Sequence, residues 1–521
     1  MGEALLEAAR QLLLDPRILW IIFLAAVYGI FIGSIPGLTA TMAVALIVPL
    51  TYYLSPLEAL AAVVTLEACA IFAGDIPAAL IRMPGTPSSA AYADDLYLLS
   101  QRHGPGYPMG VSVVFSVAGG LVGAVALAFL AQPLARVAVK FTYPEYFWFY
   151  LVGLGCAVVV SRGSPLRGAL ALLLGLLFST VGMSAVHSQP RFTFDREELL
   201  QGINFIPAMI GLFGFSEVLR NLAAFGAPKG EPVAAGSGKA EPAGFWRRWV
   251  AGPWMSVYGN TLPLLWLRKG KAALASGIGA VIGVLPGAGA DIAAWVSYGV
   301  SKKLSKKPDE YGKGSLEGVI DSGAANNAAL GGAWVPTMVF GIPGDSITAI
   351  VIGILMMKGV RPGPRIFEEQ APLVYGLYLV FVIANLLLIP LGFLAIKAGS
   401  RLVRVPRRIL LPIIMLSCII GSFAINGSTF DVWVMLGFGL LGFVLERFQV
   451  PLGPVVLGIV LGGPLEEAYI QTLTASRGSF GAFFERGGSI VLAGGAILLW
   501  LSPLFRFIRR RPASPAGGGG A

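Results

Sequence analysis

Two matched sets of Pro-Gly dipeptides inside apolar sequence are the feature of this chain with the clearest chemical meaning. Pro36-Gly37 and Pro286-Gly287 both occur in the pattern G-x-x-P-G-x-[TG]-A, and Pro84-Gly85 and Pro343-Gly344 follow further along. Proline and glycine interrupt a helix and free backbone groups, which a membrane protein tolerates only inside protein or beside a wet cavity. Hydrophobic segments interrupted at matching places in two halves point to the central site of a transporter.

The spacing within the two sets is also matched. A further proline, Pro77 or Pro336, comes seven residues before the later Pro-Gly, and the paired dipeptides are 48 and 57 residues apart. We therefore predict two-fold repeated halves with broken helices or re-entrant hairpins, surrounding a solute site. A duplicated scaffold with a purely structural role is the alternative.

Broken helices would offer N-terminal N–H groups with partial positive charge, which suit a carboxylate substrate. Hydroxyl and amide side chains near the breaks could add donors. The expected substrate contacts are Pro36, Gly37, Thr39, Arg82, Pro84, Gly85, Thr86, Ser88, Pro286, Gly287, Gly289, Asn326, Asn327, Pro343, Gly344 and Ser346.

Three of these residues have structural alternatives. The adjacent amides Asn326 and Asn327 lie in a small, apolar stretch, where they are costly unless hydrogen-bonded, and they could simply join two helices. Arg82 directly precedes a break, where a charge suggests function, but it could instead pair with Asp75, Asp94 or Asp95.

Three carboxylates stand beside the breaks: Asp75, Asp291 and Asp345. Each could bind a coupling cation such as Na⁺ or carry H⁺, and each could equally be a structural cap. No resident cofactor or metal is expected.

The elements that position these residues follow from composition. Of the 521 residues, 56% are hydrophobic and 13% charged, against roughly 25% charged in soluble domains. Lipid must cover most of the exterior, and the long apolar runs suit helices rather than barrel strands. We predict an all-α polytopic membrane protein with about 12 or more membrane segments. The net charge of +10 is gathered in a few loops and does not indicate nucleic-acid binding.

The chain divides at changes of composition. We expect an N-terminal interfacial helix (1–17), a first transmembrane half (18–222), a hydrophilic linker (223–247), a second transmembrane half (248–505) and a basic, then Gly-rich tail (506–521).

Four basic stretches set the orientation: Arg220–Lys271, Lys302–Lys313, Lys397–Arg408 and Arg506–Arg511 are all placed in the cytoplasm. The segment 272–301 then begins and ends on one side, so we predict that it is a hairpin.

Two apolar segments, 272–285 and 346–357, are shorter than the roughly 20 residues of a full crossing, so we read them as half-helices. The loop after the first hairpin, Thr51–Pro56, has no basic residue, whereas the matching loop Lys302–Lys313 is basic. This difference suggests that the halves are inverted.

Enzyme chemistry has little support in the sequence. The chain has two histidines, His103 and His187, and lacks the motifs of metalloproteases, serine hydrolases and P-loop proteins. The cysteines Cys69, Cys156 and Cys418 are isolated in apolar segments. We predict that the protein is not an enzyme.

Together these motifs resemble the large membrane subunit of the tripartite tricarboxylate transporters. The resemblance covers about residues 18–505 and is carried by the stretches Gly33–Pro49, Ile76–Ala91, Gly283–Tyr298, Asn326-Asn327 with Val335-Pro336 and Gly341–Gly344, Gly359–Pro364, and Pro454–Gly462. The chain departs from the family pattern at Gly323, at Arg82 and at Asp94-Asp95, near the expected site.

The resemblance implies a secondary transporter in a bacterial inner membrane, driven by a Na⁺ or H⁺ gradient. It implies two partners, a small four-helix membrane subunit and a periplasmic solute-binding protein, and organic carboxylates as substrates. A stand-alone carboxylate carrier and a structural membrane protein without transport activity are the alternatives.

Overall fold

The computed structural model describes residues 2–160, 164–184, 189–223, 254–259, 261–403, 405 and 407–509. The described chain is almost entirely helical, with one short antiparallel pair of strands, β1 (Gly182–Met183) and β2 (Pro190–Arg191). The expected all-α class is thus confirmed. Residues 224–247 of the expected linker and 510–521 of the tail lie outside the described residues.

The helices of the first half are α1 (Gly2–Leu14), α2 (Pro16–Gly33), α3 (Ala40–Thr51), α4 (Pro56–Ala73), α5 (Asp75–Ile81), η1 (Ser89–Ala91), α6 (Ala93–His103), α7 (Gly106–Ala138), α8 (Tyr143–Val160), α9 (Pro165–Ser179), η2 (Glu197–Leu199), α10 (Phe205–Met209), η3 (Ile210–Phe215) and α11 (Ser216–Ala223).

The helices of the second half are η5 (Met255–Gly259), α13 (Leu262–Leu267), α14 (Lys269–Val284), α15 (Gly289–Leu304), η6 (Pro308–Glu310), α16 (Leu316–Phe340), α17 (Ser346–Met357), α18 (Ile366–Glu369), α19 (Ala371–Leu402), α20 (Arg407–Asn426), α21 (Thr429–Arg447), α22 (Leu452–Ala475), η7 (Phe480–Phe484) and α23 (Gly487–Arg509).

Within the described residues, eight helices are long and apolar enough to cross a membrane, and four shorter apolar helices accompany them. The outer helices expose large apolar side chains, such as Ile413, Leu416 and Ile420 of α20, as expected for a surface in contact with lipid. The chain is therefore a multi-pass membrane protein. The expectation of about 12 or more membrane segments stays a prediction.

Two short hairpins form at the first Pro-Gly of each half, α2–α3 and α14–α15. Gly37 and Gly287 turn the chain with φ angles of 85° and 77°, in the left-handed region that glycine reaches without strain. At the start of α3, Oγ1 of Thr39 accepts a hydrogen bond from the backbone N–H of Met42 at 3.2 Å. The segment 272–301 has the predicted hairpin form.

The second Pro-Gly of each half lies in a loop closed by reciprocal hydrogen bonds. The Asp345 carboxylate accepts from the N–H of Thr348, and the Thr348 hydroxyl accepts from the N–H of Asp345. Thr86 and Ser89 make the same exchange with two hydroxyls, each bond being 3.2 Å long. These capping boxes fix where the chain leaves each loop.

Each hairpin packs on the next long helix through glycine. A Cβ atom at Gly33 would overlap the carbonyl oxygen of Ala70 in α4, and one at Gly283 would overlap that of Ala329 in α16. Small residues allow helix backbones to approach this closely in membrane proteins.

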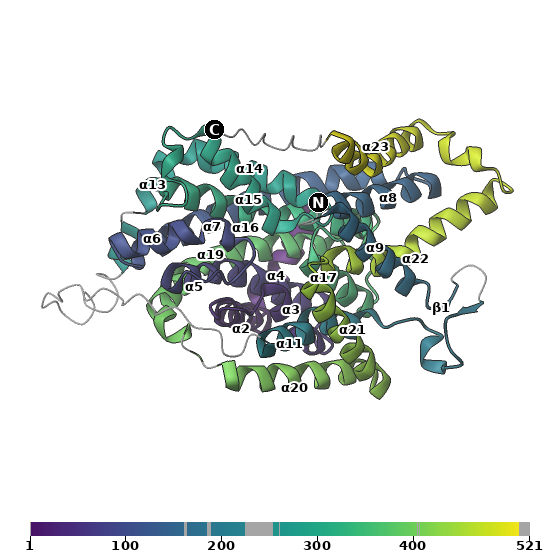
Figure 1. Cartoon of the computed structure of the whole chain (residues 1–521), viewed down its shortest axis with the longest axis horizontal. Helices are drawn as coiled ribbons and strands as arrows, with labels where there is room; N and C mark the ends of the chain where they lie inside the picture. The colour runs from purple at the N-terminus through teal and green to yellow at the C-terminus, as the bar shows by residue number, and fades with distance from the viewer. Residues whose placement is uncertain are drawn as a thin grey trace, which may run out of the picture.

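The centre of the molecule is built from α4, α7, α16 and α19. Residues Leu57–Ala73 of α4 and Gly318–Val339 of α16 are all buried. Figure 1 shows the α14–α15 and α2–α3 hairpins on opposite sides of this central layer. The order of contacts agrees, because α14 packs on α16, α16 on α7, α7 on α19, α19 on α4 and α4 on α2. Both hairpins therefore face the middle of the protein.

Candidate functional site

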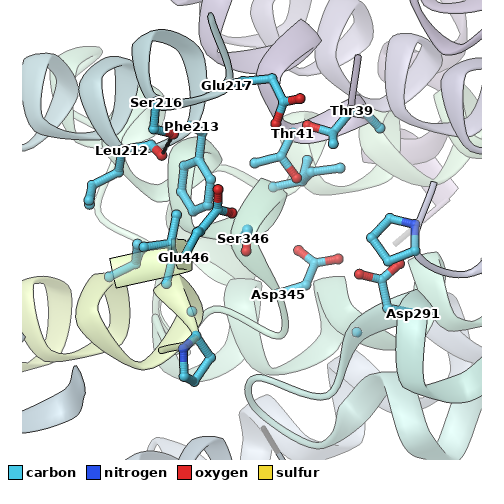
Figure 2. Close-up of a pocket in the computed structure, with 18 of the residues that line it drawn as sticks. Thr39, Thr41, Leu212, Phe213, Ser216, Glu217, Asp291, Asp345, Ser346 and Glu446 are labelled. Atoms are coloured by element: carbon cyan, nitrogen blue, oxygen red, sulfur yellow. Dashed lines mark hydrogen bonds between the residues drawn. The ribbon is translucent and has the colours of Figure 1, made fainter. Parts of the chain in front are cut away.

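A cavity of about 1060 Å³ lies where the four Pro-Gly loops meet. Its wall includes Thr39–Thr41 and Thr86–Ser88 from the first half, and Gly287–Asp291 and Asp345–Ile347 from the second. In Figure 2, Thr39 and Thr41 face the side of the cavity from which Asp345 and Ser346 project. Segments more than 200 residues apart in sequence thus supply one polar surface.

Most of the predicted site residues belong to one of two groups. Those that line the cavity are Thr39, Thr86, Ser88, Gly287, Gly289, Asp291, Asp345 and Ser346. Those that shape the loops without lining it are Pro36, Gly37, Pro84, Gly85, Pro286, Pro343 and Gly344. The backbone N–H of Gly287 donates to the carbonyl of Gly344 at 2.8 Å, which joins the two loops of the second half.

The asparagine pair is placed elsewhere. Asn326 and Asn327 are buried within α16 and are absent from the cavity wall. Asn327 donates to the carbonyl oxygen of Gly323 at 3.1 Å, and the Oδ1 atoms of both amides lack a hydrogen-bond partner in the described chain. The structure gives these amides a position in the helix core rather than at the cavity.

Arg82 also lies away from the cavity. Its side chain is 57% exposed and forms an ion pair with Asp94 at 2.6 Å. Arg82 ends α5 with a left-handed backbone, φ 57°, immediately before the loop. Of the three carboxylates weighed as partners from the sequence, the structure selects Asp94.

The fourth residue that lies away from the cavity is Asp75, which begins α5 in the buried centre. Its carboxylate accepts hydrogen bonds from the Tyr92 hydroxyl at 2.9 Å and the Ser112 hydroxyl at 2.5 Å. It is absent from the cavity wall. This carboxylate therefore connects α5, α6 and α7 instead of facing solute.

Three helix N-termini reach the cavity wall, those of α3 at Ala40, α15 at Gly289 and α17 at Ser346. The first-turn N–H groups of a helix carry partial positive charge and form a ready site for an anion. The hydroxyls of Thr39, Thr41 and Ser346 stand next to these termini. Thr39 and Asp345 each accept one of these N–H groups, from Met42 and Thr348, so a carboxylate would bind through the other first-turn N–H groups and the hydroxyls.

Sequence reasoning missed a group of charged residues on the wall: Arg167, Glu217, Arg220, Glu446 and Arg447. Arg220 pairs with Glu217 and, at 3.3 Å, with Glu446, while Arg167 donates to the Gln449 side chain at 2.8 Å. Figure 2 shows Glu217 and Glu446 on the part of the wall away from Asp291. The sequence signal was available, because charges at the ends of apolar helices are functional candidates.

The remaining wall is apolar. Leu212 and Phe213 come from η3, a π-helical stretch between α10 and α11, and Val456 and Leu457 come from α22. Short π-helical turns within α-helices are often found at functional sites. The cavity thus combines an apolar side with a few polar groups that converge, as ligand pockets generally do.

Comparison with known proteins agrees with this architecture. Residues 19–457 match the model of the tripartite tricarboxylate transporter TctA family. The chain is 34% identical over 500 residues to an uncharacterised 52.8 kDa protein from the TAR-I ttuC′ 3′ region of Agrobacterium vitis, with 94% of each chain covered.

A second relative, an uncharacterised protein from the TAR-II ttuC′ 3′ region of the same organism, is 36% identical over 233 residues, covering 45% of this chain and 96% of the relative. No solved structure matches the chain. The family match and the near full-length relative show that this chain belongs to the tripartite tricarboxylate transporter TctA family and is its large permease subunit.

Proposed function

We propose that this permease subunit imports organic, tricarboxylate-like acids as part of a binding-protein-dependent secondary transporter driven by a Na⁺ or H⁺ gradient. The observation that carries the proposal is the cavity at the four Pro-Gly loops. Its polar wall comes from both halves, and three helix N-termini reach it. Discontinuous helices around a central site are the arrangement that secondary transporters use for anionic solutes.

The chemistry of the wall suits a small acid with more than one carboxylate. The helix N-termini and hydroxyls share the wall of the cavity with Arg167, Arg220 and Arg447. Arginine binds carboxylates through two parallel hydrogen bonds. A volume of about 1060 Å³ leaves room for the substrate together with water.

The two halves are best read as inverted repeats. Pro286 lies 250 positions after Pro36 (286 − 36), and Pro336 lies 259 after Pro77 (336 − 77). The same offsets relate the glycine contacts described above, since Gly283 is 250 positions after Gly33 and its partner Ala329 is 259 after Ala70. Equivalent backbone contacts in both halves support a structural repeat.

Contacts between α4 and α16 support the inversion. Glu67 of α4 accepts a hydrogen bond from Trp334, while further along the chain Asp75 bonds Tyr92, which is next to Asn326. The path of the chain through α4 and α5 is therefore antiparallel to α16. Related halves of opposite direction can exchange conformations and open a central site alternately to each side.

The basic stretches support the proposed orientation in a bacterial inner membrane. Gly119 and Gly123 of α7 lie against Ala324 and Ala328 of α16, so these helices are parallel. Asn385 of α19 lies against Gly120 of α7, and Gly392 lies against Val113, so α19 runs the other way. The start of α16 and the end of α19 share one end of the molecule, with Lys302–Lys313 and Lys397–Arg408, which we place in the cytoplasm.

The partners belong to the same proposal. The family name describes a tripartite system, and we assign a small four-helix membrane subunit and a periplasmic solute-binding protein to it. The binding protein would deliver substrate to the end of the permease opposite the basic stretches. A stand-alone carrier remains the second reading and predicts uptake without a binding protein.

The test is uptake into proteoliposomes that hold the permease and the small subunit, with the binding protein outside. We expect accumulation of a citrate-like or tartrate-like acid that needs the binding protein and collapses when ion gradients are dissipated. Arg447→Gln should raise the half-saturating substrate concentration by about tenfold, since an ionic hydrogen bond contributes about 1.5–3 kcal/mol.

Arg477→Gln is the matched control, because Arg477 is exposed and absent from the cavity wall. Equal uptake with and without the binding protein would favour the stand-alone carrier. Absence of uptake for every carboxylate tried, with all three components folded, would contradict the proposed function.

A further inference from the structure

Glu67 is a buried carboxylate that the proposed function has not yet used. It lies in the middle of α4 with 0% of its surface exposed. Its Oε2 atom accepts a hydrogen bond from the indole N–H of Trp334 at 3.1 Å, and its Oε1 atom has no hydrogen-bond partner in the described chain. No arginine or lysine of the described residues forms an ion pair with it.

The second observation is its position relative to the cavity. Ile71, one helical turn after Glu67 on α4, lines the cavity, and so does Asp345. The residue preceding Asp345, Gly344, packs against the neighbour of Trp334, which donates to Glu67, so the two carboxylates lie near one another. An acidic pair thus extends from the cavity wall into the helix core.

The two members of the pair differ in how well they hold a negative charge. The Asp345 carboxylate accepts hydrogen bonds from both the N–H and the hydroxyl of Thr348, each at 2.8 Å, at the N-terminus of α17. Glu67 has a single donor and an apolar surrounding. Two close carboxylates in a dry interior do not both remain ionised without a cation. The inner carboxylate, Glu67, is therefore the one that binds the cation.

A proton fits this position better than a metal ion. Hard metal cations require several oxygen ligands, whereas the hydrogen-bond partner of Glu67 in the described chain is the Trp334 N–H, a donor that would repel a cation. Asp345 offers a route by which the proton can pass between the cavity and Glu67.

We propose that Glu67 is the proton-binding residue that couples a proton gradient to substrate movement, with Asp345 as its connection to the cavity. This inference rests on the proposed function and selects H⁺ over Na⁺. A neutral Glu67 leaves less negative charge behind the anion site, so proton and substrate each favour binding of the other. Such coupling is reciprocal and typically amounts to 5–150-fold in affinity.

The experiment compares Glu67→Gln with wild type in proteoliposomes containing the small subunit and the binding protein. Two readouts are taken: accumulation driven by an imposed pH gradient, and exchange of labelled for unlabelled substrate at equal pH on both sides. We expect accumulation to fall at least about tenfold while exchange persists, because exchange requires no net proton movement.

Thr65→Val is the matched control, since Thr65 is a buried polar residue of the same helix whose hydroxyl also has no partner in the described chain. It should keep both activities. Accumulation by Glu67→Gln at the wild-type level would overturn the proposal. So would wild-type accumulation that follows a Na⁺ gradient and ignores pH, although the proposed function would then stand.

A second variant keeps the test decisive if Glu67→Gln does not fold. Trp334→Phe retains the carboxylate but removes its N–H donor, which destabilises the ionised form. We expect the pH of half-maximal accumulation to move upward. An unchanged pH profile in a folded Trp334→Phe protein would overturn the proposal, whereas failure of wild type to exchange substrate would instead contradict the proposed function.

Discussion

The Pro-Gly loop after α5 and the one after α16 have the same framework and different charges. Both close with a capping box, Thr86 with Ser89 in the first half and Asp345 with Thr348 in the second. The cap accepting from the helix is a neutral hydroxyl in one half and a carboxylate in the other. The shared geometry shows that reciprocal hydrogen bonds to the backbone set the shape of both loops. The charge of the capping residue can therefore differ between the halves.

A second difference in charge between the halves lies in the long helices α4 and α16. Glu67 lies ten residues before Pro77, and Asn326 lies ten before Pro336, so the two occupy equivalent places in α4 and α16. One is a carboxylate beside Trp334, and the other is an amide beside Tyr92. The acidic pair of Glu67 and Asp345 therefore occurs in one of the two frameworks, because the equivalent positions in the other hold Asn326 and Thr86.

The largest effect is expected from a side chain placed in the shared framework. Gly283→Val would force a branched side chain against the carbonyl of Ala329, and Gly33→Val would do the same at Ala70. Overpacking typically costs about 1–3 kcal/mol and more where backbone must move. We expect little folded protein from either variant, measured by size-exclusion chromatography after heating in detergent.

Gly277→Val is the control for this prediction. It lies on the same helix as Gly283, and a Cβ there would meet open space. A folded Gly283→Val protein as heat-resistant as Gly277→Val would mean that α14 and α16 do not pack as described.

The next effect concerns the difference between the loops. Asp345→Thr gives the second loop the neutral cap of the first, so stability should change by no more than about 1 kcal/mol. Accumulation of substrate should nevertheless fall about tenfold, within the usual range of site coupling, because the connection to Glu67 loses its carboxylate. Unaltered accumulation would show that the charge difference between the halves has no role in transport.

A smaller effect is expected from weakening either capping box. Thr348→Val removes the hydroxyl that accepts from Asp345, and Ser89→Ala removes the corresponding hydroxyl in the first half. Loss of a cap costs about 0.5–2 kcal/mol. Similar decreases in the temperature of unfolding would support equivalent loops, and a large difference between the two variants would break the equivalence.

The smallest effect is expected at the ion pairs near the hairpin starts. Glu58 pairs with Arg17, whereas Glu317, at the equivalent position of α16, pairs with Arg268 and Lys271. Partly exposed pairs contribute about 0–1 kcal/mol. Glu317→Gln should lower stability slightly more than Glu58→Gln, since it loses two partners, and thermal unfolding at low and high salt would measure the difference.

Much of the architecture could be read from residue types. The apolar composition and the Pro-Gly dipeptides led to a helical membrane protein with broken helices, because few other residues interrupt a helix in lipid. The loop residues Thr39, Thr86 and Ser346 were also assigned to the site, and the structure places them on the cavity wall.

The positions of the other site residues depend on how distant helices pack, which cannot be read from the neighbouring residues in the sequence. Asn326 and Arg82 are polar residues near breaks, yet helix rotation directs the first into the core and the second to Asp94. Glu67 was overlooked inside an apolar run, although its equivalence to Asn326 follows from counting back from Pro77 and Pro336. Arg167 and Arg447 reach the cavity only because α9, α21 and α22 fold against the loops.

The way the two halves interlock has a consequence for how the protein is made. α7 precedes the linker but packs on α16, and α19 follows it but packs on α4. During synthesis, the small-residue faces of α4 and α7 therefore enter the membrane well before their partners exist. We therefore expect the first half to remain incompletely packed until the second half has been inserted and covers these faces.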